Sequence, residues 1–467
     1  MRLPSVFVGL AVALAACGPG TDANAPNRSP LAEKWLTRAK QSYRSGDFED
    51  ARTSADSALK ASPSDQDIRI LNARIALSAL DYTQTLKLTE GLQTSDVHGL
   101  RGRAHWYAGD VELAAEELEA MLQDPNVKDP WAREVAKLAR RGQGRHPFQM
   151  EGGLIAAVDL PPAGAALVVP CELEGERILA LVATSIGELV VDSNSRKEPA
   201  WVNLKFGDRL EVKDVPALTQ DLSGLSRQLG APVKALLGVN LLRHMHVTFD
   251  RRGGQFIVRR DEPTPPPDAS RVPLWYIRGG GMLLRANMSN KPDSLALLLV
   301  DSSAPFPLAL EDATWRRAGI DPATLKPEPA AQNMKAGMVP SIKLGGFDLQ
   351  DIPALQGAPT GDIQGNVDVD LGGVLGAGLL ALFRFTLGDE GRFAWLEPDP
   401  GMAMGRPPAP TVPAARAPGA APAPGPAPGP APASGPAPGP APSAAPKPVA
   451  PAPNAVPKPI PAPASKK

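Results

Sequence analysis

Two stretches of the sequence, "KFGDRLEVKDVPAL" (residues 205–218) and "KLGGFDLQDIPAL" (residues 343–355), repeat one pattern and decide the fold. Each has a glycine turn, alternating apolar and polar residues, and then Asp, a β-branched residue and Pro-Ala-Leu. Alternation with a period of two around a glycine turn predicts a β-hairpin. A second matched pair follows in the same order, "LLGVNLLRHMHVTFD" (236–250) and "VLGAGLLALFRFTLGD" (374–389). The sequence therefore predicts a duplicated β unit.

In each copy, a short loop follows an apolar strand and precedes the hairpin. The loop of the second copy lies in "LLLVDSSAPFPLAL" and reads Asp-Ser-Ser from Asp301. The loop of the first copy lies in "LALVATSIGELVV" and reads Ala-Thr-Ser from Ala183. The two copies therefore differ in one acidic group at matched positions.

This arrangement resembles the retropepsin-like aspartic proteases, in which each half carries an Asp-Thr/Ser-Gly loop and a later apolar-apolar-Gly segment. The segments here end at Gly238 and Gly376. The resemblance implies an all-β, bilobal domain like that of the acid proteases, with one lobe over residues 150–262 and the other over residues 270–398.

The resemblance also places Asp301 where a catalytic aspartate stands, followed by Ser302 and by Ser303 in place of the family's glycine. Peptide hydrolysis by this route needs two carboxylates that share one proton, so that one draws a proton from water while the other protonates the amide. Each half must supply one of them.

The first loop lacks its carboxylate, because Ala183 stands at the matched position. Thr184, which is followed by Ser185, keeps the hydroxyl that locks the two loops together in that family. The resemblance thus implies a retained fold with a damaged active site. Two sources of a second carboxylate stay open but are disfavoured. One is Asp192, further along the first copy, and the other is a dimer in which two molecules bring their copies of Asp301 together.

Other candidate sites are weak. His244 and His246 would alternate on one face of a strand, but no nearby cluster completes a metal site, so we expect surface histidines and no metal or other cofactor. Cys171 lies in an apolar run and is expected to be a buried, inert thiol.

Residues 31–143 have helical spacing and two similar stretches, "GDFEDARTSADSALKASP" from Gly46 and "GDVELAAEELEAMLQDP" from Gly109. Each places a small residue, Ala51 or Ala114, five positions after the glycine. The pattern resembles tetratricopeptide repeats, and a weaker middle copy makes three helical hairpins. A generic helical bundle without a peptide groove stays open as the alternative.

The two ends of the chain differ from the rest in composition. Residues 1–17 have a basic residue, a short apolar run and "LAAC", which resembles the lipobox of bacterial lipoproteins with Cys17 as the lipidated residue. A linker over residues 18–30 follows. Residues 401–467 are rich in Pro and Ala and are expected to be a disordered tail.

Composition narrows the function classes. Lys and Arg number 49 and Asp and Glu number 50, so no net field favours nucleic acid. We therefore expect a multidomain, lipid-anchored envelope protein, with the outer membrane favoured and the protein facing the periplasm or surface. Its helical repeats and degenerate protease-like domain would bind a peptide or protein partner without catalysis. An active aspartic endopeptidase with an unidentified second carboxylate, and an assembly scaffold acting through the helices, are the alternatives.

Overall fold

A computed structural model describes residues 28–161, 166–278, 280–291, 294–328, 334–357 and 367–398. The predicted signal peptide, its lipidation residue Cys17, most of the linker and the Pro/Ala tail lie outside these described residues. Within them, no helix combines the length and the apolar character needed to cross a bilayer. The described chain begins with helices and continues with strands, which confirms the predicted order of the two regions.

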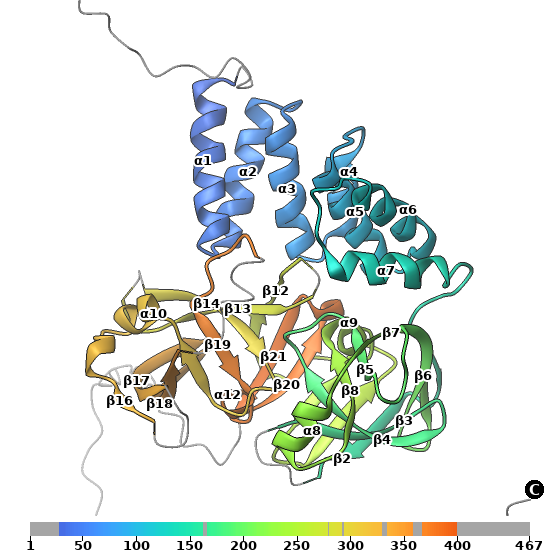
Figure 1. Ribbon diagram of the computed structural model, residues 1–467. Coiled ribbons are helices and arrows are strands. Elements are labelled where there is room, and N and C mark those ends of the chain that lie inside the picture. The colour runs from blue at the N-terminus through green and yellow to red at the C-terminus, as the bar shows by residue number, and fades with distance from the viewer. Residues whose placement is uncertain are drawn as a thin grey trace, which may run out of the picture. The chain divides into compact units, whose positions relative to one another are not determined.

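Seven helices make up the first region (Figure 1). They are α1 (Pro30–Arg44), α2 (Phe48–Ala61), α3 (Gln66–Ser78), α4 (Tyr82–Thr89), α5 (Ser95–Ala108), α6 (Val111–Leu122) and α7 (Pro130–Arg140). Contacts join α1 to α2, α3 to α4 and α5 to α6, so three consecutive pairs form and α7 packs on the last.

The repeated Gly-Asp stretches explain how two of these pairs form. Gly46 and Gly109 adopt φ of 78° and 88°, a left-handed conformation that ends the preceding helix and favours glycine. Asp47 then caps α2 by accepting a hydrogen bond from the backbone of Asp50. Ala51 and Ala114 are fully buried in the cores of the helical region. The structure is compatible with helical repeats.

Within the described residues, twenty-one strands and several short helices make up the second region. The first half holds β1 (Gln149–Gly152), β2 (Ile155–Asp159), β3 (Val168–Leu173), β4 (Glu176–Ala183), β5 (Leu189–Asp192), β6 (Ala200–Phe206), β7 (Leu210–Gln220), α8 (Ser223–Leu229), β8 (Val233–Gly238), α9 (Val239–His244), β9 (Thr248–Asp250) and β10 (Gln255–Arg259). The second half holds β11 (Ser270–Pro273), β12 (Trp275–Tyr276), β13 (Met282–Asn287), β14 (Leu295–Asp301), β15 (Leu308–Leu310), α10 (Asp312–Arg317), η2 (Pro322–Thr324), β16 (Lys326–Pro327), β17 (Lys335–Leu344), β18 (Phe347–Gln356), β19 (Gly373–Gly376), α12 (Ala377–Leu380), β20 (Phe383–Gly388), η3 (Asp389–Gly391) and β21 (Phe393–Pro398).

Six strands of each half follow the same order, β7-β5-β8-β4-β3-β6 in the first and β18-β15-β19-β14-β13-β17 in the second. The first forms a sheet in the order β1-β7-β5-β8-β4-β3-β6, and the pairing of β6 with β7 closes it. The second forms the order β12-β13-β14-β19-β15-β18-β17-β16, and the pairing of β13 with β17 closes it. In both, the strand before the loop runs parallel to the strand that ends in glycine, β4 to β8 and β14 to β19. The halves are therefore two lobes built from one repeated unit.

Backbone conformation repeats along with the strand order. Gly207 and Gly345, in the matched hairpin turns, have φ of 57° and 58°. Asp214 and Asp351, which precede the Pro-Ala-Leu steps, have φ of 51° and 52°. Few residues other than glycine adopt a positive φ, and aspartate is among those that do so most often, so its occurrence at both matched positions agrees with the duplication.

A third sheet joins the lobes in the order β11-β21-β20-β9-β10-β2. Its centre is the antiparallel pair β9 and β20, one strand from each lobe, with Thr248 opposite Thr386. Their hydroxyl oxygens are 2.8 Å apart and both side chains are buried. The lobes are thus held in one orientation by a continuous sheet of six strands.

Candidate functional site

The two matched loops lie against each other at the ends of β4 and β14. Thr184 Oγ1 donates to the backbone oxygen of Val300 at 2.7 Å and accepts from the amide of Ser302 at 3.0 Å. In return, Ser302 Oγ donates to the backbone oxygen of Val182 at 2.8 Å and accepts from the amide of Thr184 at 3.2 Å. Both hydroxyl side chains are fully buried, so these four hydrogen bonds fix one loop relative to the other.

The matched positions beside these bonds carry Asp301 and Ala183. Asp301 Oδ1 accepts hydrogen bonds from the amide of Ser303 at 2.9 Å and from its hydroxyl at 2.6 Å. Ser303 therefore folds back onto the carboxylate of Asp301. Ala183 is buried and supplies only a methyl group. The two matched positions thus carry one carboxylate, that of Asp301.

The two glycine segments pack tightly behind the loops. A Cβ atom on Gly238 would lie 2.1 Å from the backbone oxygen of Glu188, and one on Gly376 would lie 2.1 Å from that of Phe306. Ser185 ends the first loop, and its backbone oxygen lies 3.2 Å from the Cβ position of Gly281 in the second lobe. The structure thus brings the predicted loop and glycine residues together at one place.

Asp192, the alternative carboxylate of the first copy, lies at the end of β5 away from the loop and is engaged there. It accepts hydrogen bonds from the amides of Leu222 and Asn194 and forms an ion pair with Lys234 at 3.3 Å. Burial acts to raise the pKa of Asp192, but these bonds outweigh burial and lower it.

The histidine prediction is wrong in its geometry. His244 is the last residue of α9, and His246 precedes β9 with φ of 42°, so the two do not alternate on a strand. The sequence signal failed because the helical turn of α9 extends further than the Leu pair suggested. His244 is not a surface residue either, since its ring stacks on Phe148 at 4.4 Å and its buried Nε2 has no hydrogen-bond partner among the described residues.

Cys171 lies in β3 and is buried, as expected. Burial raises the pKa of its thiol to about 12, which makes it inert as a nucleophile at neutral pH.

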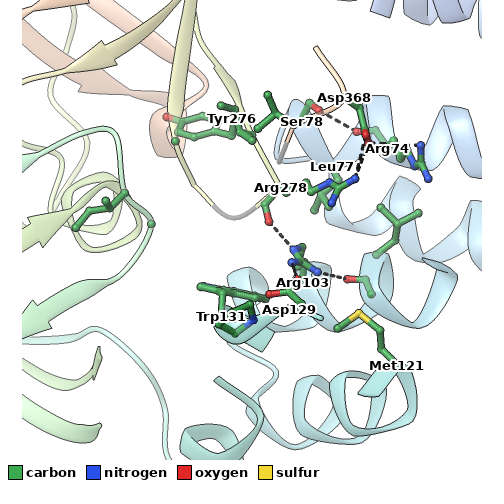
Figure 2. A pocket seen from close by; sticks show the side chains of 18 of the residues that line it. Arg74, Leu77, Ser78, Arg103, Met121, Asp129, Trp131, Tyr276, Arg278 and Asp368 are labelled. Atoms are coloured by element: carbon green, nitrogen blue, oxygen red, sulfur yellow. Dashed lines mark hydrogen bonds and ion pairs between the residues drawn. The ribbon is translucent and has the colours of Figure 1, made fainter. Parts of the chain in front are cut away.

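A cleft of about 870 Å³ lies between the helices on one side and the end of the first-lobe loop and the turn after β12 on the other (Figure 2). Its walls come from α1, α3, α5 and the connection before α7 on one side, and from the first-lobe loop and the turn after β12 on the other. The apolar lining includes Leu77, Leu100, Met121, Trp131, Ile186 and Ile277. The charged lining is Arg74, Arg103, Lys128 and Arg278 against Asp96, Asp129, Glu188 and Asp368. The volume is within the range of ligand sites, and the charges balance.

Hydrogen bonds and aromatic contacts attach the helices to both lobes around this cleft. Arg103 of α5 donates to the backbone oxygen of Arg278 and pairs with Asp129, as Figure 2 shows. Arg243 of α9 donates to the backbone oxygen of Tyr107 at 2.6 Å. Trp106 lies edge-on to Trp201 of β6, with ring centroids 6.1 Å apart. The helical region therefore rests directly on the loop side of the lobes.

Glu188 is the most unusual ionisable group in the cleft. It follows the first-lobe loop, is only 5% exposed, and accepts a hydrogen bond from the indole of Trp106 at 3.2 Å. Burial raises the pKa of Glu188 to about 7 despite this bond. The hydrogen bond joins the carboxyl of Glu188 in the first lobe to Trp106 on α5.

Glu188→Gln is expected to remove a pH dependence of stability. Because the pKa of Glu188 is raised in the folded state, protonation of its carboxyl stabilises the fold. This contribution to stability is complete below about pH 4.5, the pKa of an unfolded glutamate, and is lost as the pH rises through about 7. The wild-type protein should lose on the order of 1–3 kcal/mol between pH 5 and 7.5, measured by thermal unfolding. Glu198→Gln, at an exposed glutamate, should leave that dependence in place. Equal pH profiles for the wild type and Glu188→Gln would contradict the assignment.

Sequence reasoning identified the loops but not the cleft. Glu188 was visible as a charge inside the apolar run "TSIGELVV", which is the signal that could have indicated a buried polar group. Arg103 and Arg278 carried no such signal, because they are 175 positions apart and meet only in the folded chain.

Three solved structures show where the chain is similar to known proteins. A retropepsin-like aspartic protease from Rickettsia conorii is 20% identical, with 29% of this chain and 95% of that chain covered and a TM-score of 0.22. The Arabidopsis OM64 TPR domain is 16% identical, with 24% and 92% covered and a TM-score of 0.21. The first TPR of Spaghetti (RPAP3), solved with the HSP90 peptide SRMEEVD, is 15% identical, with 25% and 94% covered and a TM-score of 0.21.

These likenesses are weak and each spans only a part of the chain. No protein-family model and no curated protein sequence matches it.

Proposed function

We propose that this chain is a lipid-anchored bacterial envelope protein, attached through Cys17 and facing the periplasm or surface, that binds a peptide or protein partner without cleaving it. The observation that carries the proposal is the pair of loops joined by four buried hydrogen bonds, with Ala183 at the position that matches Asp301. The contacts that maintain the fold are kept, while the second proton-handling group is missing.

The cleft supports the proposal that the chain binds a peptide or protein partner. It is lined by helical residues and by the loop residues Ser185–Glu188, so a ligand there would contact both regions at once. Its mixture of apolar and charged side chains suits an extended peptide, which has both kinds of group.

Binding can be tested with the full chain and a library of random-sequence peptides. We expect enriched peptides whose affinity falls at least about tenfold in Val127→Trp, because Val127 lines the cleft and a larger side chain would fill it. Leu113→Trp, at a residue 47% exposed on α6 outside the cleft, is the matched control and should bind as the wild type does. The same loss in both variants, or no enrichment at all, would reject the proposal.

A second experiment tests for peptide hydrolysis, and we expect none. Incubation of the full chain with an unfolded protein at pH 3–5 is expected to give no cleavage, because Asp301 has only Ser303 as a hydrogen-bond partner among the described residues. Cleavage that pepstatin inhibits and that Asp301→Ala abolishes would establish the endopeptidase alternative instead.

A further inference from the structure

A short acidic segment of the second lobe lies against the helices. This segment, residues 367–371 or "VDVDL", leads into β19 and alternates apolar residues with aspartates. Its apolar residues Val369 and Leu371 are buried in a cluster with Phe48 of α2 and Trp275 of β12. Its two aspartates are exposed on the opposite side. The segment thus has one apolar and one acidic face.

The acidic face pairs with arginines from both regions. Both oxygens of Asp368 lie 3.0 Å from Nη2 of Arg278, and one lies 3.5 Å from Nη1 of Arg74 on α3 (Figure 2). Asp370 lies 3.2 Å from Nε of Arg44 on α1, and its amide donates to the backbone oxygen of Arg44 at 2.6 Å. Ion pairs therefore hold the segment at Asp368 and Asp370, and a backbone hydrogen bond also holds it at Asp370.

Two hollows flank the segment. The 870 Å³ cleft and a second hollow of about 790 Å³ both include Tyr43, Arg74, Asp96, Val367 and Asp368 in their linings. The helical surface is thus hollowed on both sides of the acidic segment, and the segment occupies only a part of the available length.

The linings of the two hollows have balanced charge with the segment in place and a basic excess when it is set aside. Six basic residues then stand against four acidic ones: Lys40, Arg44, Arg74, Arg103, Lys128 and Arg278 against Asp67, Asp96, Asp129 and Glu188. The two aspartates of the segment therefore supply the negative charge that balances this surface. Such a surface favours an acidic ligand and disfavours a basic one.

The segment is held by contacts that a second peptide could reproduce. Its ion pair with Arg44 is exposed, and pairs of this kind contribute about 0–1 kcal/mol. Its apolar side chains contact Phe48 and Trp275, which would accept similar side chains from another chain. Because the segment is tethered, it has the advantage of a high local concentration over any free peptide.

We propose that the composite groove formed by Arg44 and Arg74 of the helices and Arg278 of the second lobe binds an extended partner peptide in which apolar residues alternate with acidic ones. Residues 367–371 occupy this groove in the resting chain, and the partner binds by displacing them. This inference rests on the proposed binding function and names the chemical class of its ligand.

A labelled peptide "NVDVDLG" tests the inference by fluorescence anisotropy with the full chain. The double variant Asp368→Lys, Asp370→Lys repels its own segment from the groove and should bind the peptide at least about tenfold more tightly than the wild type. The neutral peptide "NVNVNLG" should bind the double variant no more tightly than it binds the wild type. Affinity should fall with salt, because the recognition is by charge.

Glu112→Lys with Glu116→Lys is the matched control, since it makes the same change of charge at exposed positions on α6. Equal gains in both double variants, or no gain in either, would overturn the inference. Enriched library peptides that Val127→Trp weakens would in that case still support the proposed function, so the two failures can be told apart.

A second measurement needs no variant. Hydrogen exchange of the wild-type chain at saturating "NVDVDLG" should become faster at the Asp370 amide, which loses its bond to Arg44, and stay unchanged at Thr184. Unchanged exchange at Asp370 with the peptide bound would show that the peptide lies elsewhere and would reject displacement.

Discussion

Gly238→Ala and Gly376→Ala are each expected to destabilise the folded protein by about 4 kcal/mol or more. The added Cβ would lie 2.1 Å from a backbone oxygen, that of Glu188 in one lobe and that of Phe306 in the other. Backbone cannot rotate away as a flexible side chain can, so the loops beside Ala183 and Asp301 would have to move. Thermal or urea unfolding should therefore show a large loss in either variant.

Gly224→Ala is the matched control for this prediction. A Cβ there meets no atom within 4 Å, and the residue lies in α8, where alanine favours the helix over glycine. Its stability should stay the same or rise by less than about 1 kcal/mol. Losses below about 1 kcal/mol in both lobe variants would mean that the loops are not packed as described.

Thr184→Val should cost about 4 kcal/mol, because it removes one hydroxyl that makes two buried hydrogen bonds between the lobes. Valine has nearly the same shape, so the loss is chiefly that of polar contacts. The backbone oxygen of Val300 and the amide of Ser302 would each stay buried without this partner, at about 1–3 kcal/mol per group.

Thr184→Ser tests the contribution of the methyl group separately from that of the hydroxyl. Serine keeps both hydrogen bonds and loses one methyl group, so a cost near 1 kcal/mol is expected. If Thr184→Ser were as damaging as Thr184→Val in unfolding experiments, packing of the methyl group rather than the interlobe bonds would hold the loops.

These variants test the fold apart from catalysis. Thr184 and Ser302 join the lobes whether or not Asp301 has an acidic partner, since their bonds use hydroxyl and backbone groups alone. The contacts that join the two loops therefore need no carboxylate at position 183.

The duplicated β unit was predictable because its signals are local. Glycine turns, alternation and apolar-apolar-Gly steps each depend on residues close in sequence, and the structure repeats the strand order and even the positive φ of Asp214 and Asp351. The helical pairs were predictable for the same reason, through Ala51 and Ala114. The histidine prediction failed where helix and strand periods compete over a few residues, at His244 and His246.

The sequence by itself determined the order of helices and lobes, the matched loops, and the absence of a second aspartate at Ala183. Only the tertiary structure decided that the helices rest on the loop side of the lobes, that Glu188 is buried against Trp106, and that residues 367–371 pair with Arg44 and Arg74. The physical reason is how far apart in the sequence the interacting residues lie. Local periodicity specifies each element, whereas burial of a charge or pairing of distant side chains depends on which surfaces meet when the whole chain folds.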